Sequence, residues 1–246
     1  MGIHRGDLQE ALLSTLIGAA HGEVPRTGKE LVEFRQEGDR VLARFADTTT
    51  ESGDLLVGAD GLRSRVRAIL HADGEPRYAG FTSWRGIAHG FPAKKLPLGR
   101  GFETWGPGGL FGCGHVGDDS IYWFATRITP KGKRDGPEGP KAQLLRTFDA
   151  WHEPIGELIA GTDDAHILRT DVYDRDPLTG SWGQGRVTLL GDAAHPMTPN
   201  LGQGASQAIE DAVVLARCLA PAVRGGRTSR ERCGAMRTRE AREPHR

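Results

Sequence analysis

The sequence predicts a mixed α/β protein, because buried strands occur near helices at both ends of the chain and a β-rich segment lies between them. Two apolar strands, at residues 54–57 and 187–190, each lead into a glycine and an aspartate. The middle of the chain holds short apolar runs bounded by Gly and Pro, and all five tryptophans lie between residues 78 and 182. Strands followed by helices favour a parallel sheet, whereas consecutive short strands favour an antiparallel one.

The composition excludes several classes of protein. The 246 residues carry 32 basic and 32 acidic side chains, so the formal net charge is zero and nothing points to nucleic acid or an anionic membrane. No apolar run is long enough to span a bilayer, and the start lacks a signal-peptide pattern. The three cysteines are widely spaced and the histidines lack ligand spacing, which predicts no disulfide framework, no metal site and a reducing, cytoplasmic location.

The strand at Val187–Leu190 delivers a single carboxylate to its carboxyl end. Gly191 has no Cβ, so another backbone or a ligand can approach it closely. Asp192 follows where open α/β sheets bind ligands, and its carboxylate can accept hydrogen bonds from sugar-like hydroxyls. Pro196 and Pro199 fix the φ angles of the loop and stiffen it.

A long helix is predicted after this loop. Gly202 and Gly204 leave the backbone N–H groups bare where the helix begins. Those unpaired donors, together with the positive end of the helix dipole, favour an anion or a carbonyl that develops negative charge. Small apolar residues recur at helical spacing and predict one face for close packing, at Ala208, Ile209, Ala212, Val213 and Ala216.

A second strand-to-helix segment occurs earlier in the chain. The apolar run at 54–57 leads to Asp60-Gly61, which is predicted to form a turn. Ser64 lies near the start of a short helix that is expected to end around Leu70. Three basic residues here are typical of a solvated helix face: Arg63, Arg65 and Arg67. We favour this interpretation for Arg63.

The start of the chain predicts an amphipathic helix. It follows His4-Arg5, and its apolar residues fall on one face at Leu8, Leu12, Leu13 and Leu16. The forked donors of Arg5 suit phosphate or carbonyl oxygens. A surface arginine on an amphipathic helix is the alternative interpretation.

Together these three segments resemble FAD-dependent monooxygenases of the aromatic-hydroxylase (para-hydroxybenzoate hydroxylase-like) family. In that family the Gly-Asp pair contacts the ribityl chain, the Pro…Gly-Gln-Gly loop faces the flavin ring, and the Asp-Gly motif serves FAD and the reduced nicotinamide cofactor. An arginine of the first helix reaches the cofactor. The resemblance therefore implies cofactor-binding roles for Arg5, Asp60, Gly61, Gly191, Asp192, Pro199, Gly202, Gln203, Gly204 and Ala205.

The run Gly112-Cys113-Gly114-His115-Val116-Gly117 fits G-x-G-x-x-G by letter, but we reject it as a nucleotide site. Such a fingerprint must follow a strand and open a helix, whereas here a turn cluster and the strand-like run 121–126 follow. We expect a hairpin instead. The family carries its dinucleotide fingerprint upstream of the arginine helix, so the N-terminal Rossmann unit and the extreme C-terminus are expected to be missing from this sequence.

The implied architecture is a partial FAD-binding three-layer domain with an inserted β-rich substrate domain. Its expected segments are 1–75 and 172–246 for the FAD-binding layer and 76–171 for the substrate layer. A hairpin at 31–34 and 41–45 extends the first layer. The substrate layer is predicted to hold strands at Phe81–Ala88, Gly101–Trp105, Gly109–His115 and Ile121–Arg127, an exposed loop at Pro130–Pro140 and a helix at Lys141–Trp151.

Most aromatic side chains of this layer are predicted to fill its core. Alternation along the strand places Tyr122 and Phe124 on one face and Trp123 on the other. By resemblance this layer roofs the flavin and forms the substrate pocket. Arg85 is a candidate to aid an anionic substrate, and Pro199 is a candidate to shape the pocket of the ring.

The resemblance implies an NADH- or NADPH-dependent hydroxylase of small aromatic or cyclic organic molecules. The reduced nicotinamide would reduce FAD, O₂ would add to it, and the resulting flavin hydroperoxide would transfer a hydroxyl group to the substrate. Two alternatives stay open. The chain is a non-catalytic remnant or a partner-dependent fragment of such an enzyme, or the same scaffold performs epoxidation or oxidative decarboxylation.

Overall fold

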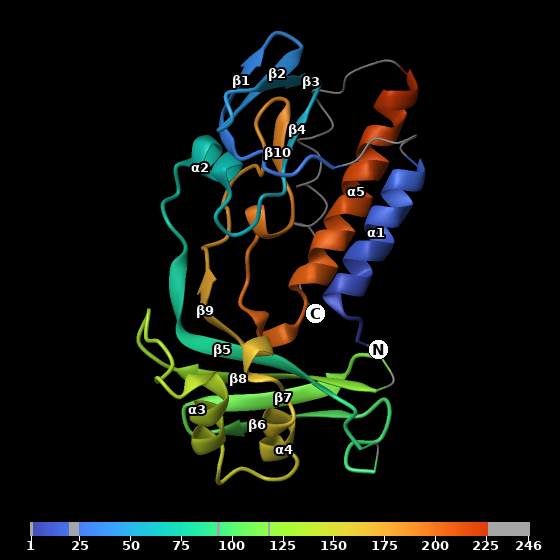
Figure 1. Ribbon diagram of the computed structural model, residues 1–246. Helices are drawn as coiled ribbons and strands as arrows, with labels where there is room; N and C mark the ends of the chain where they lie inside the picture. The colour runs from blue at the N-terminus through green and yellow to red at the C-terminus, as the bar shows by residue number, and fades with distance from the viewer. Residues whose placement is uncertain (1, 20–24, 93, 118, 226–246) are drawn as a thin grey trace. The chain divides into compact units, whose positions relative to one another are not determined.

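The computed structural model describes residues 2–19, 25–92, 94–117 and 119–225, and its ribbon is drawn in Figure 1. The chain forms two compact units. The first unit comprises Met1–Pro25 and Gly80–Val172, and the second comprises Arg26–Ala79 and Tyr173–Arg246. The division into FAD-binding and substrate layers stays a prediction, and this grouping by compactness places the first 25 residues with the β-rich unit.

The first unit is built on a five-stranded sheet with the order β6-β7-β8-β5-β9. Strand β8 pairs antiparallel with both β5 and β7, and β7 pairs antiparallel with β6. The predicted strands of the middle segment are therefore confirmed. They are β5 Arg77–His89, β6 Gly101–Gly106, β7 Gly109–His115 and β8 Ser120–Ile128. The fifth strand, β9 Leu168–Asp174, was not predicted from the sequence.

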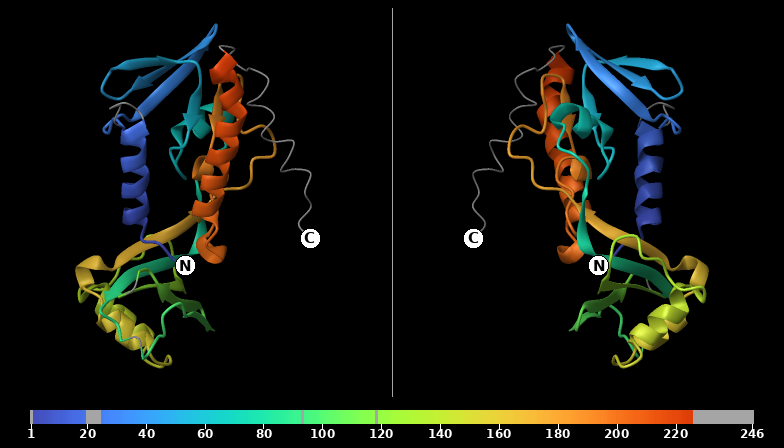
Figure 2. Two further views of the ribbon diagram at one scale, coloured as in Figure 1. Left: turned by 90° about the vertical axis from the view of Figure 1, so that its right-hand side faces the viewer. Right: turned by 90° about the vertical axis from the view of Figure 1, so that its left-hand side faces the viewer.

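Aromatic and aliphatic side chains from one face of this sheet form the core of the first unit. Trp84, Phe111 and Trp123 are almost fully buried, and the rings of Phe111 and Trp123 stack with centroids 5.6 Å apart. Helices α3 (Gly139–Thr147) and α4 (Ile155–Ala160) cover this face (Figure 2). Each fully buried aromatic or aliphatic side chain contributes about 1.5–3 kcal/mol.

One expectation for the first unit is corrected in detail and another is confirmed. The helix predicted at 141–151 ends at Thr147, because Phe148 has left the helical conformation with φ −108° and ψ 14°. A short 3-10 helix, η1 (Asp164–His166), precedes β9. The rejected glycine-rich run is confirmed as part of a hairpin, since Gly112–His115 belong to β7 and His115 pairs with Ile121 of β8.

The second unit contains a three-stranded antiparallel sheet and a two-stranded parallel sheet. The first consists of β1 (Leu31–Glu37), β2 (Arg40–Phe45) and β3 (Thr50–Gly53), which confirms the predicted hairpin. The second pairs β4 (Leu56–Gly58) with β10 (Val187–Leu189). Helix α2 (Arg65–His71) lies beside β1, as Figure 1 shows.

Close contact between β4 and α2 depends on a glycine. A Cβ added to Gly58 would lie 2.6 Å from the Cβ of Val66 and 2.9 Å from a methyl group of Leu189. Val66, Val187 and Leu189 are all buried in the core of this unit. Gly58 therefore sets how closely the short parallel sheet and the helix can pack.

The two long helices form as predicted, but their apolar residues are placed differently. Helix α1 (Arg5–Ala19) contains no buried residue, and Leu12 is 59% exposed. Helix α5 (Gly204–Gly225) exposes Ile209 by 50% and buries Asp211 instead, which is 3% exposed. The predicted small apolar face of α5 is thus wrong, because the buried side of the helix is set by the loop after β10.

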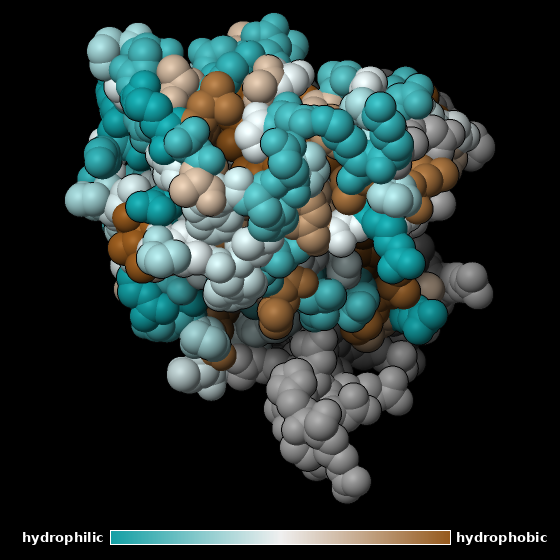
Figure 3. Space-filling model, turned by 90° about the horizontal axis from the view of Figure 1, so that it is seen from below, coloured by the Kyte–Doolittle hydropathy of each residue, from teal (hydrophilic) through white to brown (hydrophobic). Residues whose placement is uncertain are grey.

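The described cysteines, Cys113 and Cys218, are both free, and Cys233 lies outside the described residues. Burial raises the pKa of the Cys113 thiol to about 11. Hydrophobic residues on the face drawn in Figure 3 form small separate patches within a hydrophilic surface. Within the described part of the chain, no helix has both the length and the apolar character needed to cross a membrane.

The contact at Gly58 predicts a clear effect on stability. Gly58→Ala should lower the free energy of unfolding by about 1–3 kcal/mol, because the new methyl group overpacks the boundary with Val66. Urea denaturation followed by circular dichroism measures this change. Gly114→Ala is the control, since no atom lies within 4 Å of its added Cβ. Equal midpoints for the two variants would contradict the packing argument.

Candidate functional site

The two acidic motifs leave the same edge of one parallel sheet. Leu56 pairs with Val187 and Gly58 pairs with Leu189. The N–H of Leu190 then donates to the carbonyl of Gly58 at 3.0 Å. Residues 59–61 and 191–192 therefore follow neighbouring carboxyl ends of parallel strands, which is where such sheets bind ligands.

Asp60 is used to begin helix α2. Its Oδ1 accepts a hydrogen bond from Ser64 Oγ at 2.5 Å, and its Oδ2 accepts from the N–H of Arg65 at 2.7 Å and of Val66 at 3.2 Å. Ser64 Oγ in turn accepts from the N–H of Arg67 at 2.9 Å. These contacts satisfy N–H groups that lack helical partners, so the aspartate has a structural role at this position.

The glycine after β10 makes a turn that a side chain would obstruct. Gly191 has φ +59° and begins a short 3-10 helix, η2 (Gly191–Ala193). A Cβ there would lie 3.1 Å from the Cβ of Ala208 in α5. The buried N–H of Gly191 donates to Oδ2 of Asp211 at 2.9 Å. The turn is therefore held against α5 by packing and by a hydrogen bond.

Asp192 projects from this turn as an exposed carboxylate. It makes no hydrogen bond or ion pair with the described residues. A Cβ added to Gly204, the first residue of α5, would lie 4.0 Å from Asp192 Oδ1. The carboxylate thus stands beside the helix end where N–H groups lack intrahelical partners and the dipole is positive.

The loop between these two points carries the remaining predicted site residues of this unit. Pro199 is exposed and begins a 3-10 helix, η3 (Pro199–Leu201). Gly202 has φ +63° and its N–H donates to the carbonyl of Pro199 at 2.9 Å. Gln203 and Ala205 are exposed on either side of the start of α5. The loop also exposes the bulky side chain of Leu201, which is 82% exposed.

A buried arginine joins the two acidic motifs. Arg67 is 1% exposed, so the interpretation as a solvated face fails for this arginine, whereas Arg63 and Arg65 are exposed. Its guanidinium donates to the carbonyls of Ala194 at 2.9 Å and Ala193 at 3.4 Å, and to Asp73 at 2.6 Å. It also reaches the carbonyl of Asp176 at 3.1 Å.

A second buried arginine extends this network. Arg175 donates to the carbonyls of Leu62 at 2.8 Å and Gly74 at 2.6 Å, and to Asp73 at 3.2 Å. Asp73 is thus shared by two guanidinium groups. Buried charges are tolerated where they are paired and hydrogen-bonded, and both arginines meet that condition.

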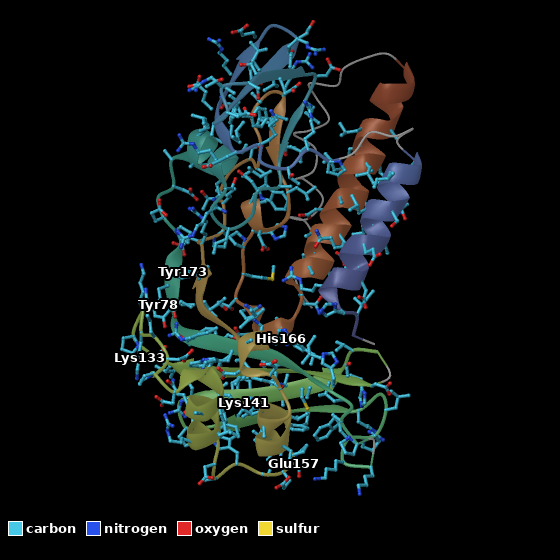
Figure 4. All side chains as sticks on the ribbon, viewed as in Figure 1. Tyr78, Lys133, Lys141, Glu157, His166 and Tyr173 are labelled. Carbon is cyan, nitrogen blue, oxygen red and sulfur yellow. The ribbon has the colours of Figure 1, made fainter. Side chains whose placement is uncertain are left out.

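Exposed arginines nearby pack on aromatic and acidic groups. The Arg63 guanidinium lies 5.4 Å from the ring centroid of Tyr173, and Tyr173 meets Tyr78 edge to face at 5.6 Å. Figure 4 shows these two tyrosines close together on β9 and β5. Arg77 also pairs with Asp174 at 3.0 Å. Solvent exposure of Arg63 agrees with the surface role expected for it.

Arg5 and Arg85 belong to the first unit. Arg5 is exposed at the start of α1. Arg85 lies on β5 and donates to Thr170 Oγ1 at 2.8 Å, while its Nε is buried without a hydrogen-bond partner. Burial raises the pKa of the Tyr122 hydroxyl, and the charges of Arg85 and Arg5 act in the opposite direction.

The five-stranded sheet has a second face, opposite the one that packs on the core of the first unit. As predicted, Trp123 is buried on one face, and the rings of Tyr122 and Phe124 stack on the other with centroids 6.1 Å apart. Gly112 on β7 leaves room for the ring of Phe124, because a Cβ there would be closer to it than any real contact allows.

The arrangement in the second unit suits a ligand with hydroxyl groups and an electron-rich edge. An exposed carboxylate accepts hydrogen bonds from hydroxyls, and an adjoining helix N-terminus favours negative charge. Within the described residues no group of three His, Cys, Asp or Glu side chains could hold a metal ion.

The sequence matches the family described as FAD binding domain over residues 8–239. The chain therefore belongs to this family of FAD-dependent monooxygenases. The mixed α/β fold agrees with that membership. The resemblance inferred from the three motifs is thus confirmed.

Curated relatives include an aurachin C monooxygenase/isomerase of Stigmatella aurantiaca, which is 48% identical over 88% of this chain and 55% of its own length. The chloroplastic zeaxanthin epoxidase of Nicotiana plumbaginifolia is 42% identical over 83% of this chain and 31% of its own length. The chain spans about half the length of the first relative and a third of the second.

Solved structures with the same fold include enzymes with bound FAD. A variant of HpxO from Klebsiella pneumoniae complexed with FAD gives a TM-score of 0.82 at 31% identity, over 96% of this chain and 59% of that one. A salicylate hydroxylase substrate complex gives a TM-score of 0.70 at 27% identity, over 88% of this chain and 57% of that one.

Sequence reasoning missed Arg67, Asp211 and the role of His195. Charged residues in helices are usually solvated, so nothing in the local pattern marks the first two as buried. Asp211 lies seven residues after Gly204 and therefore on the same helix face, but this spacing does not indicate burial. His195 follows Asp192 by three residues, within the motif itself.

The buried arginine predicts a large effect on stability. Arg67→Met should lower the free energy of unfolding by about 3–5 kcal/mol, because three backbone carbonyls lose a charged donor and Asp73 loses one of its two arginine partners. Chemical denaturation measures the change. Arg63→Met should cost less than about 1 kcal/mol, because its ion pair and ring contact are exposed. A similar loss in both variants would show that the network contributes little.

Proposed function

We propose that this chain binds FAD at the carboxyl ends of β4 and β10 and forms part of an NADH- or NADPH-dependent monooxygenase for small aromatic or cyclic molecules. One observation carries the proposal. Asp192 is an exposed carboxylate without a partner among the described residues, and it stands at the N-terminus of α5. The membership of the chain in the FAD-binding family indicates that this ligand is FAD.

The residues present fit the flavin half of that cofactor. The ribityl chain carries hydroxyl groups that can donate hydrogen bonds to the carboxylate of Asp192, and the N-terminus of α5 favours the electron-rich edge of the ring. Bound FAD would supply the redox and oxygen-activating chemistry. The chain's own contribution is to hold the cofactor, to stabilise negative charge near Gly202–Gly204, and to confine the ring beside Pro199.

The proposed role of Asp60 is less direct. Both of its carboxylate oxygens accept hydrogen bonds within the start of α2. Asp60 would therefore act on the cofactor mainly by fixing the turn at Gly61, which has φ +78°. Arg5 remains a proposed cofactor contact from the first unit.

The proposed substrate class rests on the second face of the five-stranded sheet. Tyr122 and Phe124 offer stacked rings, and Arg85 offers a cation whose Nε has no hydrogen-bond partner. A tyrosine hydroxyl is protonated at neutral pH and can donate, and burial raises the pKa of Tyr122 further. A planar organic molecule with an anionic oxygen matches these groups, and HpxO has been solved with FAD and uric acid.

Epoxidation is the second candidate reaction, because several zeaxanthin epoxidases are 39–43% identical to this chain. Both reactions insert one oxygen atom and require the same cofactor site. Mass spectrometry of the products separates them, since an epoxide hydrolyses to a diol. The non-catalytic alternative would be favoured by a purified chain that binds no added FAD.

Asp192→Asn should weaken FAD binding by about tenfold, because an amide is a poorer acceptor for several hydroxyl donors than a carboxylate. Quenching of flavin fluorescence during titration with protein measures the affinity. Asp149→Asn removes an equal charge at an exposed position of the first unit and should leave the affinity unchanged. Unchanged affinity in the Asp192 variant would refute the proposed role.

Arg85→Met should leave the affinity for FAD within about twofold and weaken the binding of anionic aromatic compounds by about tenfold, because a charge-assisted hydrogen bond is lost. Difference spectra of the flavin during titration with a panel that includes salicylate and urate provide the measurement. If the variant binds the best compound of the panel as tightly as the wild type does, Arg85 does not contact the substrate.

A further inference from the structure

We infer that Asp211 and His195 are positioning residues for the cofactor site, because together they fix the turn from which Asp192 projects. This inference rests on the proposed binding of FAD. Neither residue is expected to touch the cofactor. Their effect would be exerted through the backbone of Gly191 and through the loop that follows it.

The carboxylate of Asp211 holds two groups of this loop with one oxygen atom. Oδ2 accepts from the N–H of Gly191 at 2.9 Å and pairs with His195 Nε2 at 2.6 Å. The Asp211 side chain is 3% exposed and that of His195 is 21% exposed. The contact is therefore shielded from solvent, where hydrogen bonds to a charged group are strong.

The backbone carbonyl of Gly191 also takes part in hydrogen bonds that hold this turn. The carbonyl of Gly191 accepts from the N–H of Ala194 at 2.8 Å and from the N–H of His195 at 2.9 Å. Both polar atoms of the Gly191 backbone are thus occupied, and its φ of +59° is maintained. Asp192 is the next residue, so the direction of its carboxylate follows from this turn.

His195 is fixed by packing as well as by the hydrogen bond. Its ring lies 5.1 Å from the ring of Trp182, at an interplanar angle of 48°. The carbonyl of Trp182 accepts from the N–H of Leu189, the last residue of β10. The imidazole therefore connects the strand that enters the turn with the helix that leaves the loop.

The placement of Asp211 on α5 explains why it acts on the cofactor site. It lies seven residues after Gly204, about 10 Å along the same side of the helix. The turn is thereby tied to the helix whose N-terminus stands beside Asp192. Removing Asp211 would leave the buried N–H of Gly191 without an acceptor, and the turn would relax toward solvent.

The experiment uses the full 246-residue chain and compares Asp211→Asn, His195→Ala and His195→Gln with the wild type. Glu210→Gln is the control, because it removes an exposed charge from the neighbouring position of α5. FAD and riboflavin are titrated by fluorescence quenching. Amide hydrogen exchange at residues 190–195 is followed in the flavin-free protein by mass spectrometry of short peptides.

We expect His195→Ala and Asp211→Asn to weaken binding of both flavins by about tenfold and to speed exchange at residues 190–195. His195→Gln should recover most of the affinity, since its side-chain amide can donate to Asp211. Glu210→Gln should match the wild type. Recovery by glutamine but not by alanine separates positioning from a general loss of folding.

The failures are distinguishable. If the wild type binds neither flavin, the proposed function fails and this inference falls with it. If the wild type binds flavin but His195→Ala binds it equally well, or exchange at residues 190–195 is unchanged, only the inference is overturned. If glutamine and alanine at position 195 reduce affinity equally, the pair has no specific positioning role.

Discussion

The buried guanidinium of Arg67 is the interaction on which the rest of the candidate site depends. Arg67 lies on α2, whose first N–H groups donate to Asp60. Its guanidinium donates hydrogen bonds to the carbonyls of Ala193 and Ala194, which follow the turn at Gly191. Two strand-to-helix connections that are far apart in sequence are thereby held at one sheet edge. The planar fork with five donors is what allows one side chain to join so many acceptors.

The same loop is held from its other side by α5. Arg67 supplies donors to the carbonyls of residues 193 and 194, whereas Asp211 supplies an acceptor to the N–H of Gly191 and to His195. A cation from one helix and an anion from another thus clamp one short segment. Asp192 lies inside that segment but is engaged by neither, which leaves its carboxylate available at the surface.

Much of this arrangement could be predicted from the sequence. Apolar runs ending in glycine and aspartate located β4 and β10, and short apolar runs bounded by Gly and Pro located every strand of the five-stranded sheet except β9. Alternation along β8 identified the buried face of Trp123. The buried charges could not be predicted in this way, because hydropathy assigns Arg67 and Asp211 to solvent. Their burial depends on long-range partners, such as the carbonyl of Asp176, that no local pattern reveals.

The apolar face predicted for α5 was wrong for a related reason. Helical periodicity identifies which residues share a face, but the neighbouring elements decide which face is covered. Here the loop after β10 covers the side that bears Asp211 and leaves Ile209 half exposed. The hydrophobic pattern of an isolated segment therefore predicted the helix correctly and its orientation incorrectly.

The double use of Asp60 has a consequence for the divergence of such chains. Because its carboxylate caps α2 through three donors, selection for folding retains it whether or not a cofactor is bound. Asp192 has no comparable structural contact with the described residues, so under the proposed function only selection for ligand binding would retain it. A descendant that no longer bound the cofactor could replace Asp192 while it kept Asp60. Replacement of Asp192 alone would then indicate that cofactor binding had been lost.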